Sequence, residues 1–193
     1  VEIAAAMENG KPVVPEVGIF FENKLYRGNR TSKNNTEDFN AFMSGNYPPL
    51  AESGVQIRYN YSAIHYPDNN IPLVVHKELN THLTILKLFP GINQAAVEAA
   101  FSIAELRAVI LETFGSGNAP EADWFIQSVR NAIGKGILVM NVTQCITGSV
   151  RMGVYEASRK LSDAGVIGGN DITTEAAVTK IMYLTAVSQD VKW

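Results

Sequence analysis

Cysteine is almost absent from this chain of 193 residues, since Cys145 is its single example. One cysteine cannot form an intramolecular disulfide, so we expect a protein of a reducing compartment such as the cytoplasm. The three histidines, His65, His76 and His82, lack the close spacing typical of a zinc site. We therefore expect no bound metal.

Long apolar runs and an excess of positive charge are missing as well. No apolar run approaches the ~20 residues that a transmembrane helix needs, and the formal net charge is -3. Binding to nucleic acid usually needs a broad basic field. We expect neither a membrane nor a nucleic-acid partner. The first residues, VEIAAAMENGK, lack the basic region of a secretory signal and are typical of the end of a helix.

The composition that remains is that of an ordinary globular protein, 46% hydrophobic and 18% charged. Such a length suits one sizeable domain or two small ones. The stretch HYPDNNIP, with two prolines and adjacent asparagines, is typical of a linker or a long turn. We predict a first domain over residues 1–64, a linker over 65–80 and a second domain over 81–193.

The first domain begins with an apolar run, VGIFF (17–21), which predicts a buried strand. The polar stretch YRGNRTSKNNTEDF (26–39) follows, and we expect a short helix around Glu37 to Met43. The segment VQIRYNY (55–61) alternates apolar and polar residues, as a half-buried strand does.

The second domain alternates apolar strands with amphipathic helices. LTILKLF (83–89), AVILETF (108–114) and ILVMNVT (137–143) predict strands, and a helical segment follows each. This pattern predicts an α/β fold with a parallel, flavodoxin-like sheet covered on both faces. Ligands of such sheets bind beyond the carboxyl ends of the strands. The corresponding loops here are PGI, GSGNAP and TQCITGS.

Two segments near these loops have an ordinary structural interpretation. GSGNAP (115–120) has Pro120 where a dinucleotide-binding motif has its third glycine, so a tight strand-to-helix turn is a better interpretation of it than a ligand contact. DITTEAAV (171–178) is rich in hydroxyls and carboxylates, but Thr173 or Asp171 capping a helix accounts for it.

Lys33 is the most promising catalytic candidate of the polar stretch. A lysine in a loop is usually solvated, yet Lys33 stands among Arg30, Thr31 and Asn34 just beyond a predicted strand. Burial and nearby positive charge lower the pKa of a lysine, which suits proton transfer. Tyr155, by contrast, opens a predicted helix, and a half-buried anchor is the simpler interpretation of it.

Five segments together resemble the type I, cytoplasmic L-asparaginases. They are LYRGNRTSK, GNYPPL, ETFGSGNAP, NVTQC and AGVIGGNDITTEAAVTK, which occur in the family's order and at similar spacing. The resemblance extends from about Val14 to Lys180. It implies an asparaginase/glutaminase-like fold with two α/β domains, of which residues 1–64 form the tail end of the first.

The same resemblance implies an amidohydrolase that converts L-asparagine to L-aspartate and ammonia with a threonine nucleophile and no cofactor. A second threonine, a lysine and an aspartate move protons, and backbone N–H groups stabilise the oxyanion. The segment LYRGNRTSK places the family's catalytic lysine at Lys33. Tyr155 matches a tyrosine that reaches a neighbouring subunit's site in some relatives, and Asn118 is a similar candidate. The family's assembly implies a homodimer or homotetramer.

The chain also departs from the family pattern. The motifs T-G-G-T and H-G-T-D-T, which carry the nucleophile and its threonine and aspartate partners, do not occur in it. We therefore expect a fragment that is inactive by itself. Some relatives have an allosteric asparagine site at the cysteine of T-Q-C, here Cys145, and at an arginine that Glu112 replaces. A carboxylate there disfavours an anionic ligand, so we expect weak or absent allostery.

The sequence does not exclude several other functions. A glutaminase and the amidase subunit of a tRNA-dependent amidotransferase are related enzymes, although the latter needs a nucleic-acid partner. A non-catalytic flavodoxin-like module for ligand binding or assembly is the alternative of a different class. Upstream T-G-G-T and H-G-T-D-T motifs in the gene would favour the enzyme.

Overall fold

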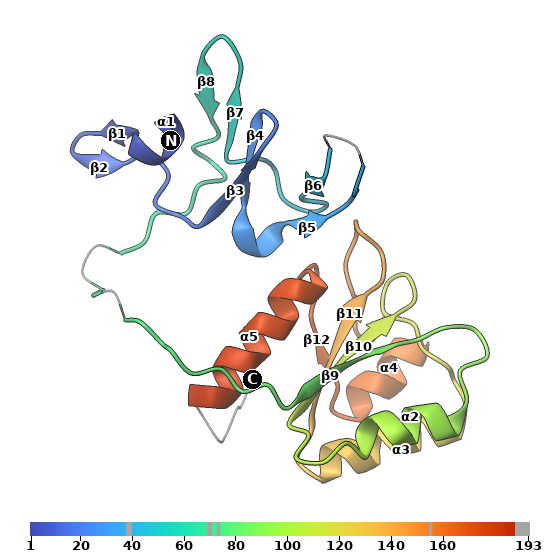
Figure 1. Ribbon diagram of the computed structural model, residues 1–193. Helices are drawn as coiled ribbons and strands as arrows, with labels where there is room; N and C mark the ends of the chain where they lie inside the picture. The colour runs from blue at the N-terminus through green and yellow to red at the C-terminus, as the bar shows by residue number, and fades with distance from the viewer. Residues whose placement is uncertain (38–39, 69–70, 73, 155, 188–193) are drawn as a thin grey trace. The chain divides into compact units, whose positions relative to one another are not determined.

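The computed structural model describes residues 1–37, 40–68, 71–72, 74–154 and 156–187. It divides into two compact units, residues 1–75 and 76–193 (Figure 1). Each unit buries hydrophobic side chains of its own. The division falls inside the stretch 65–80 that composition marks as a linker. The domain limits themselves stay a prediction.

The second unit is built on a parallel sheet. Its strands are β9 (Leu83–Lys87), β10 (Ala108–Thr113), β11 (Leu138–Thr143) and β12 (Ile167–Gly168), in the spatial order β12-β11-β10-β9. All three pairings are parallel. The predicted α/β fold with a parallel sheet is confirmed.

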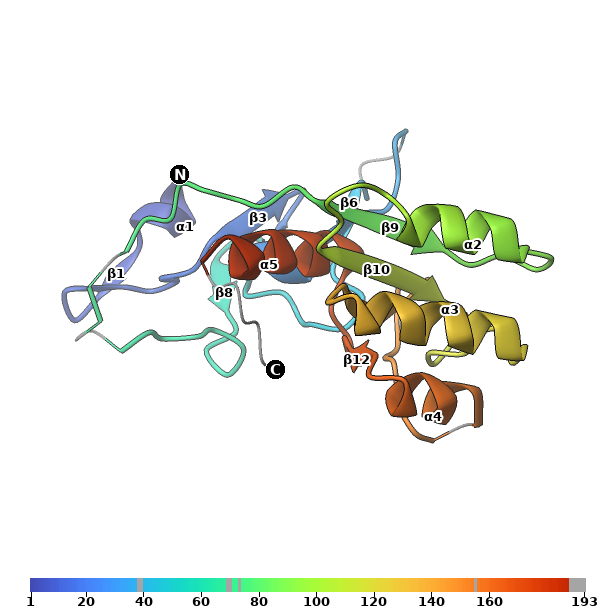
Figure 2. The ribbon, with the colours of Figure 1, turned by 90° about the horizontal axis from the view of Figure 1, so that it is seen from below.

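Helices cover both faces of this sheet, as Figures 1 and 2 show. They are α2 (Gln94–Phe101), α3 (Asp123–Gly134), α4 (Glu156–Asp163) and α5 (Thr174–Val187). Alternate residues of β10 explain the layering, since Val109 and Leu111 pack in the cluster that contains Phe125 of α3. Ala108 and Ile110 pack with Ile181 of α5 on the opposite face. A strand that is buried on both faces has a nearly continuous run of apolar residues in its sequence.

Polar side chains at the helix starts mark where two of these helices begin. The Asn93 side chain accepts a hydrogen bond from the Ala96 amide at 2.9 Å, and the Thr173 hydroxyl accepts one from the Ala176 amide at 3.2 Å. Both arrangements are N-caps. The expectation that Thr173 or Asp171 caps this helix is confirmed at Thr173.

Strands of the second unit depart from prediction at both edges of the sheet. β12 was not expected, because a two-residue strand inside GVIGGN has no apolar run to reveal it. β9 is at the other edge, so Ile85 is exposed rather than buried. The short length of β12 explains the first outcome, and edge position, which periodicity does not reveal, explains the second.

The first unit consists mainly of antiparallel strands. A short helix, α1 (Glu2–Ala5), precedes the hairpin of β1 (Met7–Glu8) and β2 (Lys11–Pro12). A sheet follows in the spatial order β3-β4-β7-β8. Its strands are β3 (Gly18–Phe21), β4 (Lys24–Arg27), β7 (Ala51–Ser53) and β8 (Ile57–Tyr59). Leu25, Leu50 and Ala51 are buried at its centre.

Two expectations about this unit are wrong. The run VGIFF is not buried, because β3 lies at an edge of the sheet and leaves Val17 and Phe20 exposed. A helix around Glu37 to Met43 is replaced by β6 (Phe42–Met43), which pairs with β5 (Ser32–Lys33). Residues 38–39 lie outside the described part of the chain. Pairing with β5 satisfies backbone groups that a helix would bond internally.

Candidate functional site

Lys33 lies in a short hairpin just beyond the end of β4. The chain leaves β4 at Arg27, makes a 3-10 turn over Gly28–Arg30 and enters β5, where Lys33 is paired with Phe42 of β6. The Asn34 amide donates to the Ala41 carbonyl at 2.7 Å and extends this pairing. The Lys33 side chain is exposed in this structure, rather than partly desolvated as expected.

A half-buried ion pair lies at the base of this hairpin. Both carboxylate oxygens of Glu16 accept hydrogen bonds from the Arg27 guanidinium, one from Nε and one from Nη2 at 2.8 Å. Burial acts to raise the pKa of Glu16, but hydrogen bonds from Arg27 and from the His65 amide hold it below its usual value. Glu16 in turn raises the pKa of Arg27. Both groups stay charged at neutral pH.

The aromatic ring of Tyr47 completes this cluster. The Arg27 guanidinium carbon lies 4.3 Å from the ring centroid and that of Arg30 lies 5.4 Å from it. The Ala63 carbonyl accepts from Arg27 Nη2 at 3.0 Å and from the Tyr47 hydroxyl at 2.8 Å. Cation–π contacts and hydrogen bonds thus join segments 36 residues apart in the sequence.

The second group of predicted residues lies at the carboxyl ends of β10 and β11. Asn118 belongs to the turn at residues 115–120, where its backbone exchanges hydrogen bonds with Phe114 at 2.9 Å. Its side-chain oxygen Oδ1 is buried and has no hydrogen-bond partner among the residues that the structure describes. A buried acceptor without a partner costs about 1–3 kcal/mol.

A buried polar network holds this turn against β11. The fully buried Thr113 hydroxyl donates to Asn141 Oδ1 at 2.6 Å, and Asn141 Nδ2 donates to the Gly117 carbonyl at 3.2 Å. Gly117 has a φ of +109°, and a Cβ there would stand 2.9 Å from a Val150 methyl. The turn therefore needs glycine at this position. Sequence reasoning missed Asn141, although an amide inside the apolar run ILVMNVT was a signal.

Residues of NVTQC connect the same strand ends. Gln144 Nε2 donates to the carbonyls of Leu88 at 2.7 Å and Glu112 at 2.9 Å, and so bridges the ends of β9 and β10. Thr143 accepts from the Cys145 amide at 3.0 Å. The Cys145 side chain is exposed.

Glu112, which stands where the resemblance leads one to expect an arginine, has partners of its own. Its carboxylate accepts a hydrogen bond from the Thr174 hydroxyl at 2.7 Å and lies 3.7 Å from Lys87 Nζ. The carboxylate is thus held by α5 and β9. It also offsets the charge of the Lys87 ammonium, which disfavours an anionic ligand there.

The predicted site residues therefore fall in different places. Lys33 belongs to the first unit, whereas Asn118 and Cys145 belong to the second. Tyr155 lies outside the described residues. Sequence reasoning did not single out Glu16, Arg27 or Tyr47, since their association needs segments that are distant along the chain.

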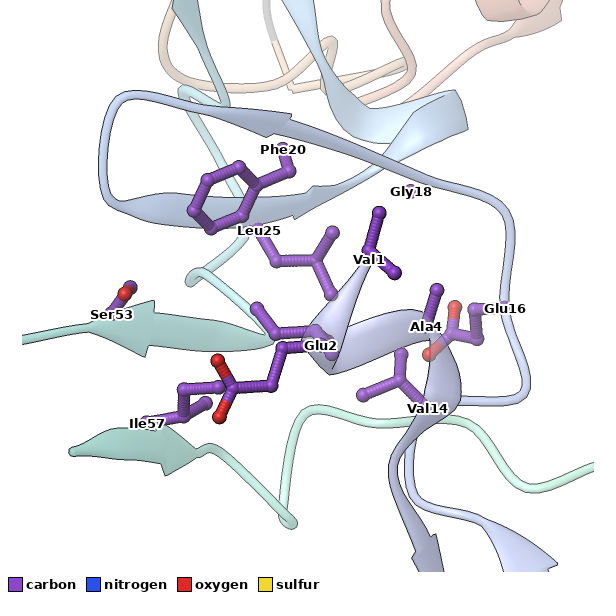
Figure 3. A pocket seen from close by; sticks show the side chains of 11 residues that line it. Val1, Glu2, Ala4, Val14, Glu16, Gly18, Phe20, Leu25, Ser53 and Ile57 are labelled. Carbon is purple, nitrogen blue, oxygen red and sulfur yellow. The ribbon is translucent and has the colours of Figure 1, made fainter.

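The first unit also contains a pocket of about 520 Å³, shown in Figure 3. Aliphatic side chains, among them Val14, Leu25 and Ile57, form much of its wall, together with the carboxylates of Glu2 and Glu16. Lys33 does not line it. Since Arg27 already binds the Glu16 carboxylate, that group is not available to a cationic ligand.

The described residues form neither a metal site nor a membrane-spanning helix. Across the described ranges, no group of three or more His, Cys, Asp or Glu side chains is placed to hold a metal ion. The helices of that same part of the chain are too short or too polar for any of them to cross a bilayer.

Comparison with known proteins places this geometry in a family. Residues 82–192 match the model of the glutaminase/asparaginase C-terminal domain, and residues 2–65 match that of the N-terminal asparaginase domain. Over 177 residues the chain is 42% identical to L-asparaginase 1 of Escherichia coli (strain K12), a match that covers 92% of this chain and 52% of that protein.

Two other relatives extend the comparison. The chain is 40% identical over 182 residues to the 60 kDa lysophospholipase of Homo sapiens, a match that covers 94% of this chain and 31% of that protein. The crystal structure of L-asparaginase I from Vibrio cholerae O1 biovar eltor str. N16961 is similar with a TM-score of 0.83 at 36% identity, covering 90% of this chain and 52% of that one.

The chain spans about half the length of L-asparaginase 1, and less of the human protein. Both family models match in the order of the two structural units, and the match to the C-terminal model takes in more than half of the sequence. This chain belongs to the glutaminase/asparaginase family, and type I L-asparaginases are among its relatives.

Proposed function

We propose that this chain is part of an L-asparaginase, in which Lys33 handles a proton while a threonine attacks the amide of L-asparagine. The observation that carries the proposal is the 42% identity to L-asparaginase 1 over 92% of the chain, with family models matching on both units. The nucleophilic threonine of the motif T-G-G-T would lie on residues other than these 193.

The position of Lys33 supports its assignment. An exposed ammonium at a strand end, on a hairpin anchored by buried groups, is available to a hydroxyl presented by another segment. A deprotonated lysine near such a hydroxyl can accept its proton and later return it to the leaving ammonia. No metal or cofactor is needed for this reaction.

The test is the replacement Lys33→Met in the protein encoded by the complete gene. We expect turnover of L-asparagine to fall by about 10²–10⁴-fold, the usual contribution of a proton-transfer group. Ammonia release is measured with L-asparagine and with L-glutamine, which also separates asparaginase from glutaminase.

Lys11→Met is the matched control, because Lys11 is an exposed lysine of the same unit, in β2. It should retain normal turnover. Near-normal activity of the Lys33→Met protein would contradict the catalytic assignment. If the unaltered protein releases ammonia from neither amide, the binding or assembly module becomes the better proposal.

The proposal extends to the second unit. Asn118 and Tyr155 would contribute to the active site of a neighbouring subunit in a homodimer or homotetramer. The buried, unpartnered oxygen of Asn118 supports this role, since an added ligand or subunit could supply a donor to it. Allosteric control through Cys145 would be weak or absent, because Glu112 presents a carboxylate held by Thr174.

A further inference from the structure

The polar cluster at the base of the β5–β6 hairpin is composed of Glu16, Arg27, Tyr47 and the Ala63 carbonyl. We propose that Arg27 in this cluster is a positioning residue, which fixes where the hairpin holds the Lys33 ammonium. This inference rests on the catalytic role proposed for Lys33. Nothing in the sequence pattern assigns Arg27 any role in the reaction.

The Arg27 side chain is held on three sides. Glu16 binds it through two hydrogen bonds, the Ala63 carbonyl accepts a third, and the Tyr47 ring lies 4.3 Å away. The side chains of Arg27 and Glu16 are 18% and 10% exposed, so solvent screens their attraction little. A planar guanidinium bound in this way has one orientation, which a lysine does not reproduce.

This cluster connects to both strands of the hairpin. On the β5 side, the buried Thr31 hydroxyl donates to the Arg27 carbonyl at 2.7 Å, two residues before Lys33. On the β6 side, the chain continues from Met43 to Tyr47, whose hydroxyl is bonded to the Ala63 carbonyl. A shift of Arg27 would therefore move the start of β5 and loosen the segment that follows β6.

The turn between Arg27 and Lys33 transmits such a shift. The Gly28 amide donates to the Val17 carbonyl at 2.8 Å, and a Cβ on Gly28 would stand 3.0 Å from that oxygen. The turn is thus packed against the segment that carries Glu16. Catalytic groups displaced by about 1 Å can lose about 10²-fold in rate. A change at Arg27 in this cluster would cause such a displacement of Lys33.

The decisive experiment measures Arg27→Met in the protein encoded by the complete gene. We expect kcat for L-asparagine to fall by about 10–10²-fold, with a much smaller change in KM, because the lysine would be misplaced while most of the substrate pocket is retained. Arg58→Met is the matched control. Arg58 pairs with Glu52 at 3.5 Å on the surface of the same unit, where the two side chains are 83% and 41% exposed.

A second measurement separates positioning from loss of stability. In a Lys33→Met background, Arg27→Met should cause no further loss of kcat, since a residue that acts through Lys33 has nothing left to position. A merely structural residue would lower kcat in both backgrounds. Arg27→Lys should recover part of the lost rate, and Tyr47→Leu offers a second way to loosen the cluster if Arg27→Met does not fold.

Hydrogen exchange gives a readout that does not depend on activity. In Arg27→Met, the paired amides of β5 and β6 and the Asn34 amide should exchange faster, whereas those of β10 and β11 should be unchanged. Unaltered kcat and unaltered exchange in a folded Arg27→Met protein would overturn the positioning role. If instead Lys33→Met keeps full turnover, the proposed function of Lys33 fails, and the exchange data alone decide whether Arg27 holds the hairpin.

Discussion

Individual residues of this chain are placed by polar contacts that are buried or half-buried. Asn141 links Thr113 to the Gly117 carbonyl, and Arg27 links Glu16 to the Ala63 carbonyl. Breaking one member of such a network leaves its partners desolvated and unpaired, which costs more than the bond contributes. Both networks lie beside the residues proposed for catalysis and subunit contact.

Glu16 makes the first unit sensitive to acid. Its pKa is lowered in the folded protein, because the hydrogen bonds from Arg27 and the His65 amide outweigh the opposite effect of burial. A lowered folded pKa stabilises the folded state above the unfolded pKa, about 4.3, and this stability is lost as pH falls through the folded value. Thermal unfolding of wild type and Glu16→Gln should therefore differ most near neutral pH.

The difference in melting temperature between these two proteins should shrink as pH is lowered from about 6 to about 3. Glu8→Gln is a control, since Glu8 is an exposed carboxylate of the same unit. A difference that stays constant over this range would show that the Glu16 charge does not stabilise the fold.

At the level of secondary-structure elements, the contribution of an N-cap to the stability of its helix can be tested directly. Thr173 accepts the Ala176 amide at the start of α5, whose Ala177 and Ile181 are buried against the sheet. Thr173→Ala should lower the free energy of unfolding of the second unit by about 1 kcal/mol, the usual contribution of such a cap. Chemical denaturation followed by tryptophan fluorescence measures this change, since Trp124 lies in that unit.

Thr179→Ala provides the comparison within the same helix. The Thr179 hydroxyl donates to the Glu175 carbonyl one turn earlier and caps nothing. Its replacement should change stability by less than about 0.5 kcal/mol. Equal effects of the two substitutions would mean that the cap contributes nothing particular to α5.

Most elements of the second unit could be predicted, because apolar strands alternate there with helices of 8 to 14 residues. β10 and β11 are buried on both faces and read as apolar runs. The short strands β5, β6 and β12 could not be predicted, since a strand of two residues shows no periodicity. The same limit hid Arg27, while Lys33 was recognised through the family resemblance of its segment.

The whole molecule combines two units with separate cores. Leu50 is buried in the cluster of the first unit, and Phe125 and Ile181 are buried in the two clusters of the second. Lys33 belongs to the one unit and Asn118 to the other. The proposed function thus depends on residues of both units. It also depends on more than one copy of the chain if subunits share sites.

Shared sites can be detected by mixing subunits. We expect hybrids of a Tyr155→Phe subunit with an inactive Lys33→Met subunit to have activities that simple dilution does not predict, because each hybrid site would combine residues of two chains. Activity is measured against the mixing ratio after the subunits are allowed to exchange. A linear dependence on the fraction of Tyr155→Phe chains would contradict sharing.

Regulation is also a property of the assembled protein. With Glu112 held by Thr174, we expect the rate to rise hyperbolically with L-asparagine concentration. Initial rates over a wide range of substrate concentration test this expectation, and a clearly sigmoidal curve would contradict it. Glu112→Arg is the informative variant, because it replaces the carboxylate by the cation that an anionic effector needs.

The Gln144 amide affects how far the connection between β9 and α2 can vary in length. It ties the end of β9 to the end of β10 through the carbonyls of Leu88 and Glu112. The exposed turn at residues 89–91 begins just after this tie. A Cβ on Gly91 would meet nothing within 4 Å, but its φ of +86° favours glycine at that one position. Residues could be inserted in that turn while the strand ends keep their spacing. Gln144 thus makes the β9–α2 connection a place for grafting new peptide segments.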